Sequence, residues 1–359
     1  MRGWLLAIWM GLTGVHAHAL CQKDNHYDLI CLRNHYQKPS SQWHPPTVDE
    51  GVVWLELAPI VIDDKPPTPI AILGRQLFFE TALSSDGQVA CVNCHDPQHG
   101  FFDPRTVPIG VYGRQGSRNS QSLIHLGLSP KSQGFFWVGR VRSLSEQVLM
   151  PLTDPNEMDI TLQSVTIRLN QKGYLPKFKS VFGETLTAIE IDQVAQALNA
   201  YLITLTPVRT RFDEFLLGDS VALSDSELLG LHVFRTKGRC MNCHFGMVMS
   251  DDKFHNLNQT LAGRPRQDFG KYAVTGDAAD FGKFKTPSLR NLSSSKPWFH
   301  HGLFTNLRGV VAIYNAGMTI PSAKNAPAIA HENHLDPFIK PSALNDEEMG
   351  ALVDFLMAL

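Results

Sequence analysis

The chain has 359 residues, of which 43% are apolar and only 18% are charged. This length favours two domains, and the charged fraction lies below the roughly 25% of average soluble domains. Lysine and arginine (32) nearly balance aspartate and glutamate (34), so the formal net charge is -2. Since no basic field is present to attract phosphate groups, the composition gives no reason to expect nucleic acid or an anionic lipid surface as a partner.

The first nineteen residues have the pattern of a secretory signal peptide. Arg2 provides a positive charge, residues 3–15 an apolar stretch, and residues 17–19 an A-x-A cleavage site. The apolar stretch is shorter than the roughly 20 residues that a membrane-spanning helix needs. We therefore expect export to the periplasm, cleavage near Ala19 and no stable membrane span.

Residues 20–69 are rich in proline and lack a sustained helical period, so we interpret them as an extended N-terminal arm rather than a core element. The arm contains Cys21 and Cys31, ten residues apart. In an oxidising compartment this spacing favours a local disulfide, although two free thiols are an alternative that spacing alone leaves open.

Two segments of the body share one layout, which indicates a duplicated unit. Residues 73–78 precede Cys91, and residues 229–234 precede Cys240. Both segments have leucine and phenylalanine at helical spacing, so each predicts a helix that leads into a cysteine motif.

A second amphipathic helix is expected to close each unit, one over residues 189–202 and one after Asn345, a favourable N-cap. No strand pattern is convincing. The helical pattern breaks near residues 217–224, which predicts an N-terminal domain over 70–217 and a C-terminal domain over 218–359. The predicted fold class is therefore mostly α.

Each unit contains the motif Cys-x-x-Cys-His. The two copies are Cys91, Cys94 and His95, and Cys240, Cys243 and His244. Two thiols at this spacing can bond the two vinyl groups of a haem, and the following histidine can bind the iron from the proximal side. A zinc site is the alternative, but nothing pairs the motifs as a four-cysteine site. We expect two covalently attached haem c groups.

The coordination position opposite each histidine decides what such a protein does. A sixth protein ligand gives an electron-transfer haem, whereas an open position allows peroxide or dioxygen to bind. The chain has ten methionines, fifteen histidines and seven tyrosines, so composition and spacing do not assign this ligand.

Six segments resemble the bacterial di-haem cytochrome c peroxidase and MauG family, in its order and with its spacings, from about residue 70 to the C-terminus. They are LGRQLFFETALSS, CVNCHDPQHGF, RNSQSL, FFWVGRVRSLSEQVLMPLTDPNEM, FKTPSLRNL and PWFHHG. The resemblance implies two cytochrome c-like domains, each with one covalently bound haem c, and a calcium ion between them. The proline-rich arm falls outside it.

The resemblance also implies site residues. Gln147 and Glu157 match the peroxide pocket over the N-terminal haem, and a carboxylate there can move a proton from the near to the far peroxide oxygen. Trp137 matches the tryptophan between the haems. From the residues alone, Glu157 would more simply cap a helix and Trp137 would be a core residue.

Calcium ligands are implied in the same way. Asn119 matches the side-chain ligand, while Ser295 and Pro297 match the positions that give main-chain carbonyl oxygens. Hard oxygen ligands suit calcium.

Two positions separate the branches of the family. Where ordinary peroxidases of the family place an axial methionine, this chain has Tyr314, as MauG-like enzymes do; Met318 is its rival, but Gly317 is expected to end the helix before it. Where those peroxidases have a histidine that blocks the N-terminal haem, this chain has Val111, which cannot bind iron.

Three positions depart from the family pattern. Val138 and His301 replace acids, and Gly238 stands where MauG has a surface tryptophan that passes oxidising equivalents to its substrate protein. The substrate of MauG is therefore not implied. Relatives that oxidise a tryptophan of a partner protein indicate that another protein target is possible.

The first interpretation is a MauG-like di-haem oxidoreductase that uses hydrogen peroxide to oxidise a tryptophan or tyrosine of a partner protein through a high-valent di-haem state. The second is a peroxidase that reduces hydrogen peroxide with electrons from small cytochromes. The third is a non-catalytic electron carrier, which an open haem beneath Gln147 and Glu157 argues against.

Overall fold

The computed structural model describes most of the chain after the expected signal peptide. The described ranges are 20–24, 26–62, 65–124, 126–128, 133–205, 209–332 and 334–359. Residues 1–19 lie outside them. Within the described ranges the regular structure is mostly helical, and none of the helices has the length and apolar character of a membrane span.

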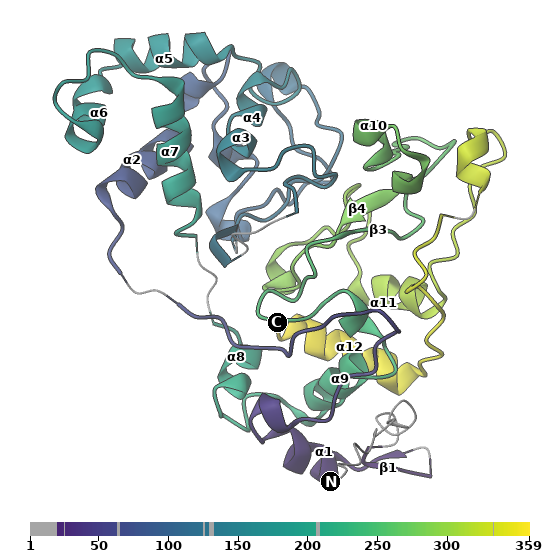
Figure 1. Cartoon of the computed structure of the whole chain (residues 1–359). Coiled ribbons are helices and arrows are strands. Elements are labelled where there is room, and N and C mark those ends of the chain that lie inside the picture. The colour runs from purple at the N-terminus through teal and green to yellow at the C-terminus, as the bar shows by residue number, and fades with distance from the viewer. Residues whose placement is uncertain are drawn as a thin grey trace, which may run out of the picture.

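The helices surround two hydrophobic cores, one above the other in Figure 1. The first core lies among α2 (Pro69–Phe78), α3 (Leu144–Gln147), α4 (Met150–Thr153), α5 (Leu162–Gln171), α6 (Leu175–Phe182) and α7 (Ile191–Leu202). The second lies among α1 (Leu29–Tyr36), α8 (Arg211–Leu216), α9 (Asp225–Arg235), α11 (Leu307–Asn315) and α12 (Asp346–Met357).

The duplicated layout appears as two similar helix pairs. In the first core α2 packs along α7, and a Cβ added to Gly74 would lie 1.8 Å from the main-chain oxygen of Ala197. In the second core α9 packs along α12, and a Cβ on Gly230 would lie 1.9 Å from the oxygen of Ala351. A glycine in each leading helix therefore allows the two backbones to approach closely.

Side chains close the ends of these helices as the sequence predicts. The Ser224 hydroxyl accepts the main-chain N–H of Glu227 at the start of α9. The Asn345 amide oxygen accepts the N–H of Glu348 at the start of α12, and the Glu348 carboxylate accepts the N–H of Asn345. Both are capping boxes, which satisfy main-chain donors that the first helical turn leaves without partners.

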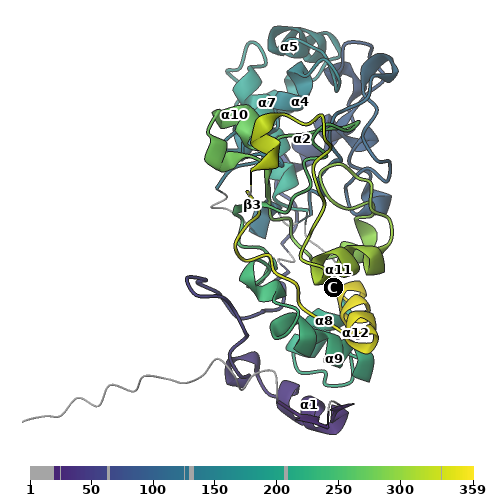
Figure 2. The ribbon, with the colours of Figure 1, turned by 90° about the vertical axis from the view of Figure 1, so that its right-hand side faces the viewer.

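The N-terminal arm is less extended than the sequence predicts. It forms the hairpin β1 (Gln22–Lys23) and β2 (His26–Tyr27) and the helix α1, and a disulfide joins Cys21 to Cys31, as expected in an oxidising compartment. Four of its buried side chains belong to the second core. These are Leu32, Tyr36, Trp43 and Leu57. Describing the arm as lying outside the core was therefore wrong, because its helix packs on α9 (Figure 2).

Two further short elements lie between the cores. Strands β3 (Phe254–Asn256) and β4 (Lys283–Lys285) pair antiparallel, near the short helix α10 (Tyr272–Thr275). The expectation that no strands form was wrong for these three-residue segments, which are too short to show a period of two.

The chain passes from the first core to the second between Leu205 and Phe212, before the boundary predicted near residue 217. Leu205 still belongs to the first core, whereas Phe212 in α8 already belongs to the second. A buried ion pair holds α8 in place, with Arg290 Nη1 lying 2.9 Å from Asp213 Oδ1. The arm joins this pair, because the N–H of Ile60 donates to the same Asp213 oxygen at 2.9 Å.

Candidate active site

A cavity of about 510 Å³ lies between the two cores and is lined by both cysteine motifs. Every residue that the sequence singled out for the site contributes to its wall. These are Cys91, Cys94, His95, Asn119, Trp137, Gln147, Glu157, Cys240, Cys243, His244, Ser295, Pro297 and Tyr314. Residues up to 223 positions apart in the chain, from Cys91 to Tyr314, thus share one space.

The two motifs are built alike. Each begins with a short 3-10 helix, Cys91–Asn93 and Cys240–Asn242, which presents its two cysteines to the cavity. His95 Nδ1 donates to the carbonyl of Phe101 at 3.0 Å, and His244 Nδ1 donates to that of Met249 at 2.9 Å. Because Nδ1 carries the proton in both rings, Nε2 is left as the metal-binding atom.

This donor set fits two haem c groups. All four cysteines of the motifs are free thiols, as covalent attachment requires. Burial lowers the pKa of His95 and of His244, so both rings are held in the neutral form that binds a metal. The zinc alternative is not supported, since each motif faces the cavity with its own histidine.

Gln147 and Glu157 approach the cavity from the first core. Gln147 is the last residue of α3, and its buried Oε1 has no hydrogen-bond partner among the described residues. Burial raises the pKa of Glu157 to about 7, with help from the negative charge of Asp154 and against the positive charge of Arg140. Thr161, not Glu157, caps the next helix, so the simpler role considered for Glu157 was wrong.

Trp137 and Asn119 are joined at the cavity wall. The indole Nε1 of Trp137 donates to the main-chain oxygen of Asn119 at 2.8 Å. The side-chain amide nitrogen of Asn119 donates to the carbonyls of Arg105 at 2.9 Å and of Thr106 at 3.4 Å. These bonds use the nitrogen end of the amide, which leaves its oxygen as the atom suited to a hard cation.

Tyr314 lies in the last turn of α11 and lines the cavity together with His244. The helix ends at Asn315, and Gly317 has a φ of +75°, so the predicted helix end before Met318 is confirmed. Met318 is fully buried and is not among the residues that line the cavity. Burial raises the pKa of the Tyr314 phenol, so without a metal it stays protonated.

Val111 is fully buried in the first core and does not line the cavity. Its N–H donates to the main-chain oxygen of Glu157 at 2.8 Å. The segment that would carry a blocking histidine is thus fixed against the loop of Glu157.

The departures from the family pattern have structural explanations. A Cβ on Gly238 would lie 2.8 Å from the oxygen of Val233, so a tryptophan does not fit there without a shift of the backbone. Val138 packs with Trp137 in a small buried cluster. His301 Nε2 lies 3.2 Å from Gln259 Oε1. At this position the family has an acid, and here a hydrogen bond between uncharged side chains replaces its salt link.

His300 is a cavity residue that sequence reasoning missed. It stacks on Phe284 with ring centroids 3.5 Å apart, lies edge-on to Trp137 at 6.3 Å, and its buried Nε2 has no hydrogen-bond partner among the described residues. His300 occurs within the segment PWFHHG, but in that segment the family pattern pointed to its neighbour His301.

His255 is a second missed residue of the cavity wall. It is held between Asp336, 2.6 Å from Nδ1, and Asp251, 2.9 Å from Nε2. Asp336 lies 81 positions away in the chain and Asp251 lies 4 positions away. The three residues therefore form no local sequence motif.

The fold and this cavity define a c-type di-haem protein. The family model of the di-haem cytochrome c peroxidases, CCP_MauG, matches residues 69–221. The chain is 34% identical to a methylamine utilization protein MauG of Methylophilus methylotrophus, over 68% of this chain and 72% of that protein. It is 30% identical to the cytochrome-c peroxidase IdrP1 of Pseudomonas sp. (strain SCT), over 88% of this chain and 86% of that protein.

A solved structure described as a MauG-like protein associated with microbial copper homeostasis has a TM-score of 0.72 and 27% identity, and the match covers 87% of this chain and 95% of that chain. The chain therefore belongs to the di-haem cytochrome c peroxidase and MauG family. It is a haem-dependent oxidoreductase of the peroxidase type, and its family implies two haem c groups.

Proposed function

We propose that this protein is a MauG-like enzyme of the periplasm that uses hydrogen peroxide to oxidise a tryptophan or tyrosine of a partner protein. The observation that carries this proposal is the position of Tyr314, which lines the cavity with His244 where Met318 does not. A tyrosinate stabilises oxidised iron better than a thioether does. Such a ligand favours an enzyme that stores oxidising power over one that only relays electrons.

The haems, when bound, supply the iron centres that exchange electrons with peroxide and with the substrate. His95 and His244 would bind the irons through Nε2, and Tyr314 would be a further protein ligand of the second iron. We propose that residues from 70 to about 210 form the peroxide-binding domain and that residues 218–359 belong to the electron-transfer domain. Helix α8 lies before the boundary predicted near residue 217, but we place it with the second domain because Phe212 packs in the second core.

In the first site Glu157 is the group that moves the proton. Its pKa of about 7 allows it to take a proton from one peroxide oxygen and return it to the other at neutral pH. The Gln147 amide would orient the peroxide, since its buried oxygen lacks another partner in the described part of the chain.

Between the sites Trp137 would share the oxidising equivalents. A calcium ion held by the Asn119 amide oxygen and the carbonyls of Ser295 and Pro297 would keep this wall in place. All three ligands line the same cavity as Trp137.

Reduction of hydrogen peroxide by small cytochromes is the second candidate. It is favoured by relatives such as IdrP1, whose name is cytochrome-c peroxidase. The two candidates differ in the oxidation state that reacts: the MauG-like enzyme needs no prior electron, whereas the ordinary peroxidase must first be reduced. A non-catalytic electron carrier would react with peroxide in neither state.

The deciding experiment mixes the resting diferric holoenzyme with one equivalent of hydrogen peroxide in a stopped-flow spectrophotometer, without reductant. We expect rapid optical changes from both haems, followed by oxidation of Trp or Tyr in a candidate partner, detected by mass spectrometry. Reaction only after reduction of one haem would replace this proposal with the peroxidase. If neither the diferric nor the reduced enzyme reacts with peroxide, the protein is a non-catalytic electron carrier.

A further inference from the structure

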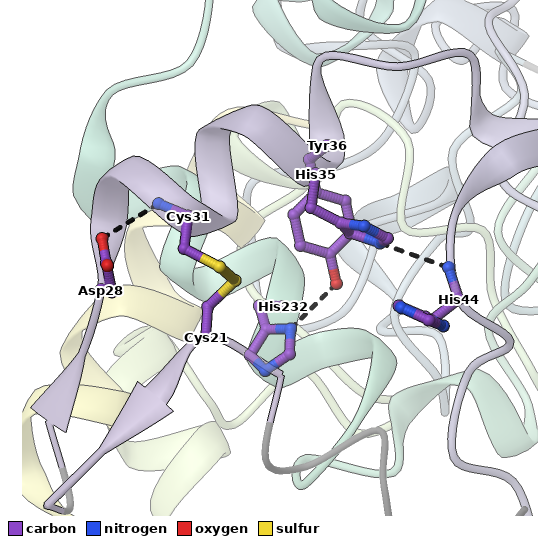
Figure 3. The surroundings of a disulfide bond; sticks show 7 residues. All are labelled: Cys21, Asp28, Cys31, His35, Tyr36, His44 and His232. Carbon is purple, nitrogen blue, oxygen red and sulfur yellow. Dashed lines mark hydrogen bonds between the residues drawn. A yellow bond between two sulfur atoms is a disulfide. The ribbon is translucent and has the colours of Figure 1, made fainter.

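The arm places a buried phenol of the second core against a buried imidazole (Figure 3). Tyr36, the last residue of α1, is 3% exposed, and its hydroxyl lies 2.9 Å from Nδ1 of His232 in α9. Burial raises the pKa of Tyr36, so the phenol keeps its proton and donates it to Nδ1. A phenol with such an acceptor can lose an electron and a proton together, which avoids a charged product on the ring.

A second phenol packs edge-on against the same imidazole. The ring centroids of Tyr36 and Tyr27 are 5.9 and 5.6 Å from that of His232. The half-buried Tyr27 hydroxyl donates to Glu348 Oε1 at 2.9 Å. Each tyrosine thus has its own proton acceptor, and Tyr27 is the more exposed of the two.

The helix that carries His232 leads into the second cysteine motif. Phe234, two residues after His232 in α9, lines the cavity. A Cβ on Gly238 would be 2.8 Å from the oxygen of Val233 and 3.4 Å from Sγ of Cys240. The last turn of α9 is therefore packed beside the sulfur that anchors the second haem.

A neighbouring indole is a poorer site for the same electron loss. Trp43 packs edge-on against Tyr36, with centroids 5.0 Å apart, but the buried guanidinium of Arg235 lies 5.0 Å from the indole centroid. An indole that loses an electron becomes a cation before it loses a proton, and a buried positive charge at this distance opposes that step. Arg235 is paired with Glu56 and lies farther from the Tyr36 ring, at 5.9 Å. The Tyr36 ring also stays neutral, because the positive charge moves with the proton to His232.

We propose that Tyr36 is a one-electron redox site and that Tyr27 is the next site toward the surface. The Tyr36 O–H bond breaks, its proton passes to His232 Nδ1, and its electron passes to the peroxide-oxidised enzyme. Tyr27 then gives its electron to Tyr36 and its proton to Glu348, while His232 returns its proton to Tyr36. This inference rests on the proposed function for its oxidant, hydrogen peroxide, and places the contact with the oxidised partner at the arm.

The test is freeze-quench electron paramagnetic resonance of the diferric holoenzyme after peroxide, without a partner protein. We expect an organic radical whose signal narrows when the tyrosines carry ring deuterium. The signal should fall at least tenfold in Tyr36→Phe and in His232→Gln. It should be unchanged in Tyr112→Phe, a matched control because Tyr112 is 64% exposed and lies in the first unit. In Tyr27→Phe it should persist longer.

Haem content and thermal unfolding of each variant show whether it has folded, and Tyr36→Phe keeps the buried ring. An unchanged signal in folded Tyr36→Phe overturns the proposal, as does wild-type enzyme that consumes peroxide without a tyrosyl signal. In the latter case the proposed function still stands if a partner is oxidised. A Tyr36 signal without oxidation of any partner supports the redox site and contradicts only the function. Diferric enzyme that ignores peroxide overturns both.

Discussion

The indole nitrogen of Trp137 donates a 2.8 Å hydrogen bond to the main-chain oxygen of Asn119. One residue is proposed to connect the two haems, and the other to bind calcium through its side chain. The N–H of Asn119 in turn donates to the carbonyl of His300 at 2.6 Å. Asn119 therefore joins Trp137, His300 and the proposed calcium site through its own main chain and side chain.

Removal of the Asn119 amide should release the calcium ion. We expect Asn119→Leu to lower the calcium content from one ion per chain to none, because leucine offers no oxygen ligand. Elemental analysis of dialysed holoenzyme measures this. Asn199→Leu is the control and should keep its calcium, because Asn199 lies in α7 and does not line the cavity. Full calcium content in Asn119→Leu would show that the ion, if present, is bound elsewhere.

The reaction of peroxide with the resting enzyme should depend on pH through Glu157. Its pKa is raised from 4.5 to about 7, and only the carboxylate can accept a proton. The rate should therefore rise with pH up to about 7 and level off above it. Glu157→Gln should slow the reaction by about a hundredfold or more and flatten the profile. Stopped-flow rates between pH 5 and 9 measure both effects.

The control for this experiment is Glu184→Gln, which removes an exposed acid outside the cavity. Its profile should match that of the wild type. A Glu157→Gln enzyme that keeps the wild-type midpoint would assign the pH dependence to another group.

The sixth ligand of the second haem can be tested with a pair of substitutions. Tyr314→Met should raise the reduction potential of that haem, because a neutral thioether favours ferric iron less than a tyrosinate does. Met318→Leu should leave the potential unchanged, since this side chain does not line the cavity. Spectroelectrochemical titration measures both. A changed potential in Met318→Leu together with an unchanged potential in Tyr314→Met would show that Met318 is the ligand.

Substitution of the glycine where α2 packs on α7, or where α9 packs on α12, should destabilise the fold. A Cβ on Gly74 or Gly230 would overlap a main-chain oxygen of the partner helix. Each change to alanine should therefore lower the free energy of unfolding by about 1–3 kcal/mol or more. Gly309→Ala in α11 is the control, because the nearest atom to its Cβ would lie 3.9 Å away. There alanine should stabilise the helix by up to about 1 kcal/mol. Thermal unfolding of the holoproteins distinguishes these outcomes.

The parts of the structure that depend on local pattern could be predicted from the sequence. The closing helix predicted over residues 189–202 is observed as Ile191–Leu202, and the capping boxes at Ser224 and Asn345 form as expected. The residues taken from motifs and from the family resemblance gather on one cavity, because the motif order and spacing specify the fold that brings them together.

The parts that depend on distant contacts could not be predicted. The helix in the arm has a weak apolar pattern of its own and is stabilised by packing on α9 and by the bond between Tyr36 and His232, which are 196 positions apart. The role of His255 in the cavity wall depends on Asp336, which only the fold brings next to it. Such partners carry no signal in a local window of sequence.

The contact between Tyr27 and Glu348 spans 321 positions of the chain. The second core is therefore complete only after two segments far apart in the chain have met. Contacts of such high sequence separation form slowly. The arm contacts the second motif, since the N–H of Asp49 donates to Asn242 Oδ1 at 2.9 Å. We therefore expect haem attachment at Cys240 and Cys243 to precede the docking of the arm.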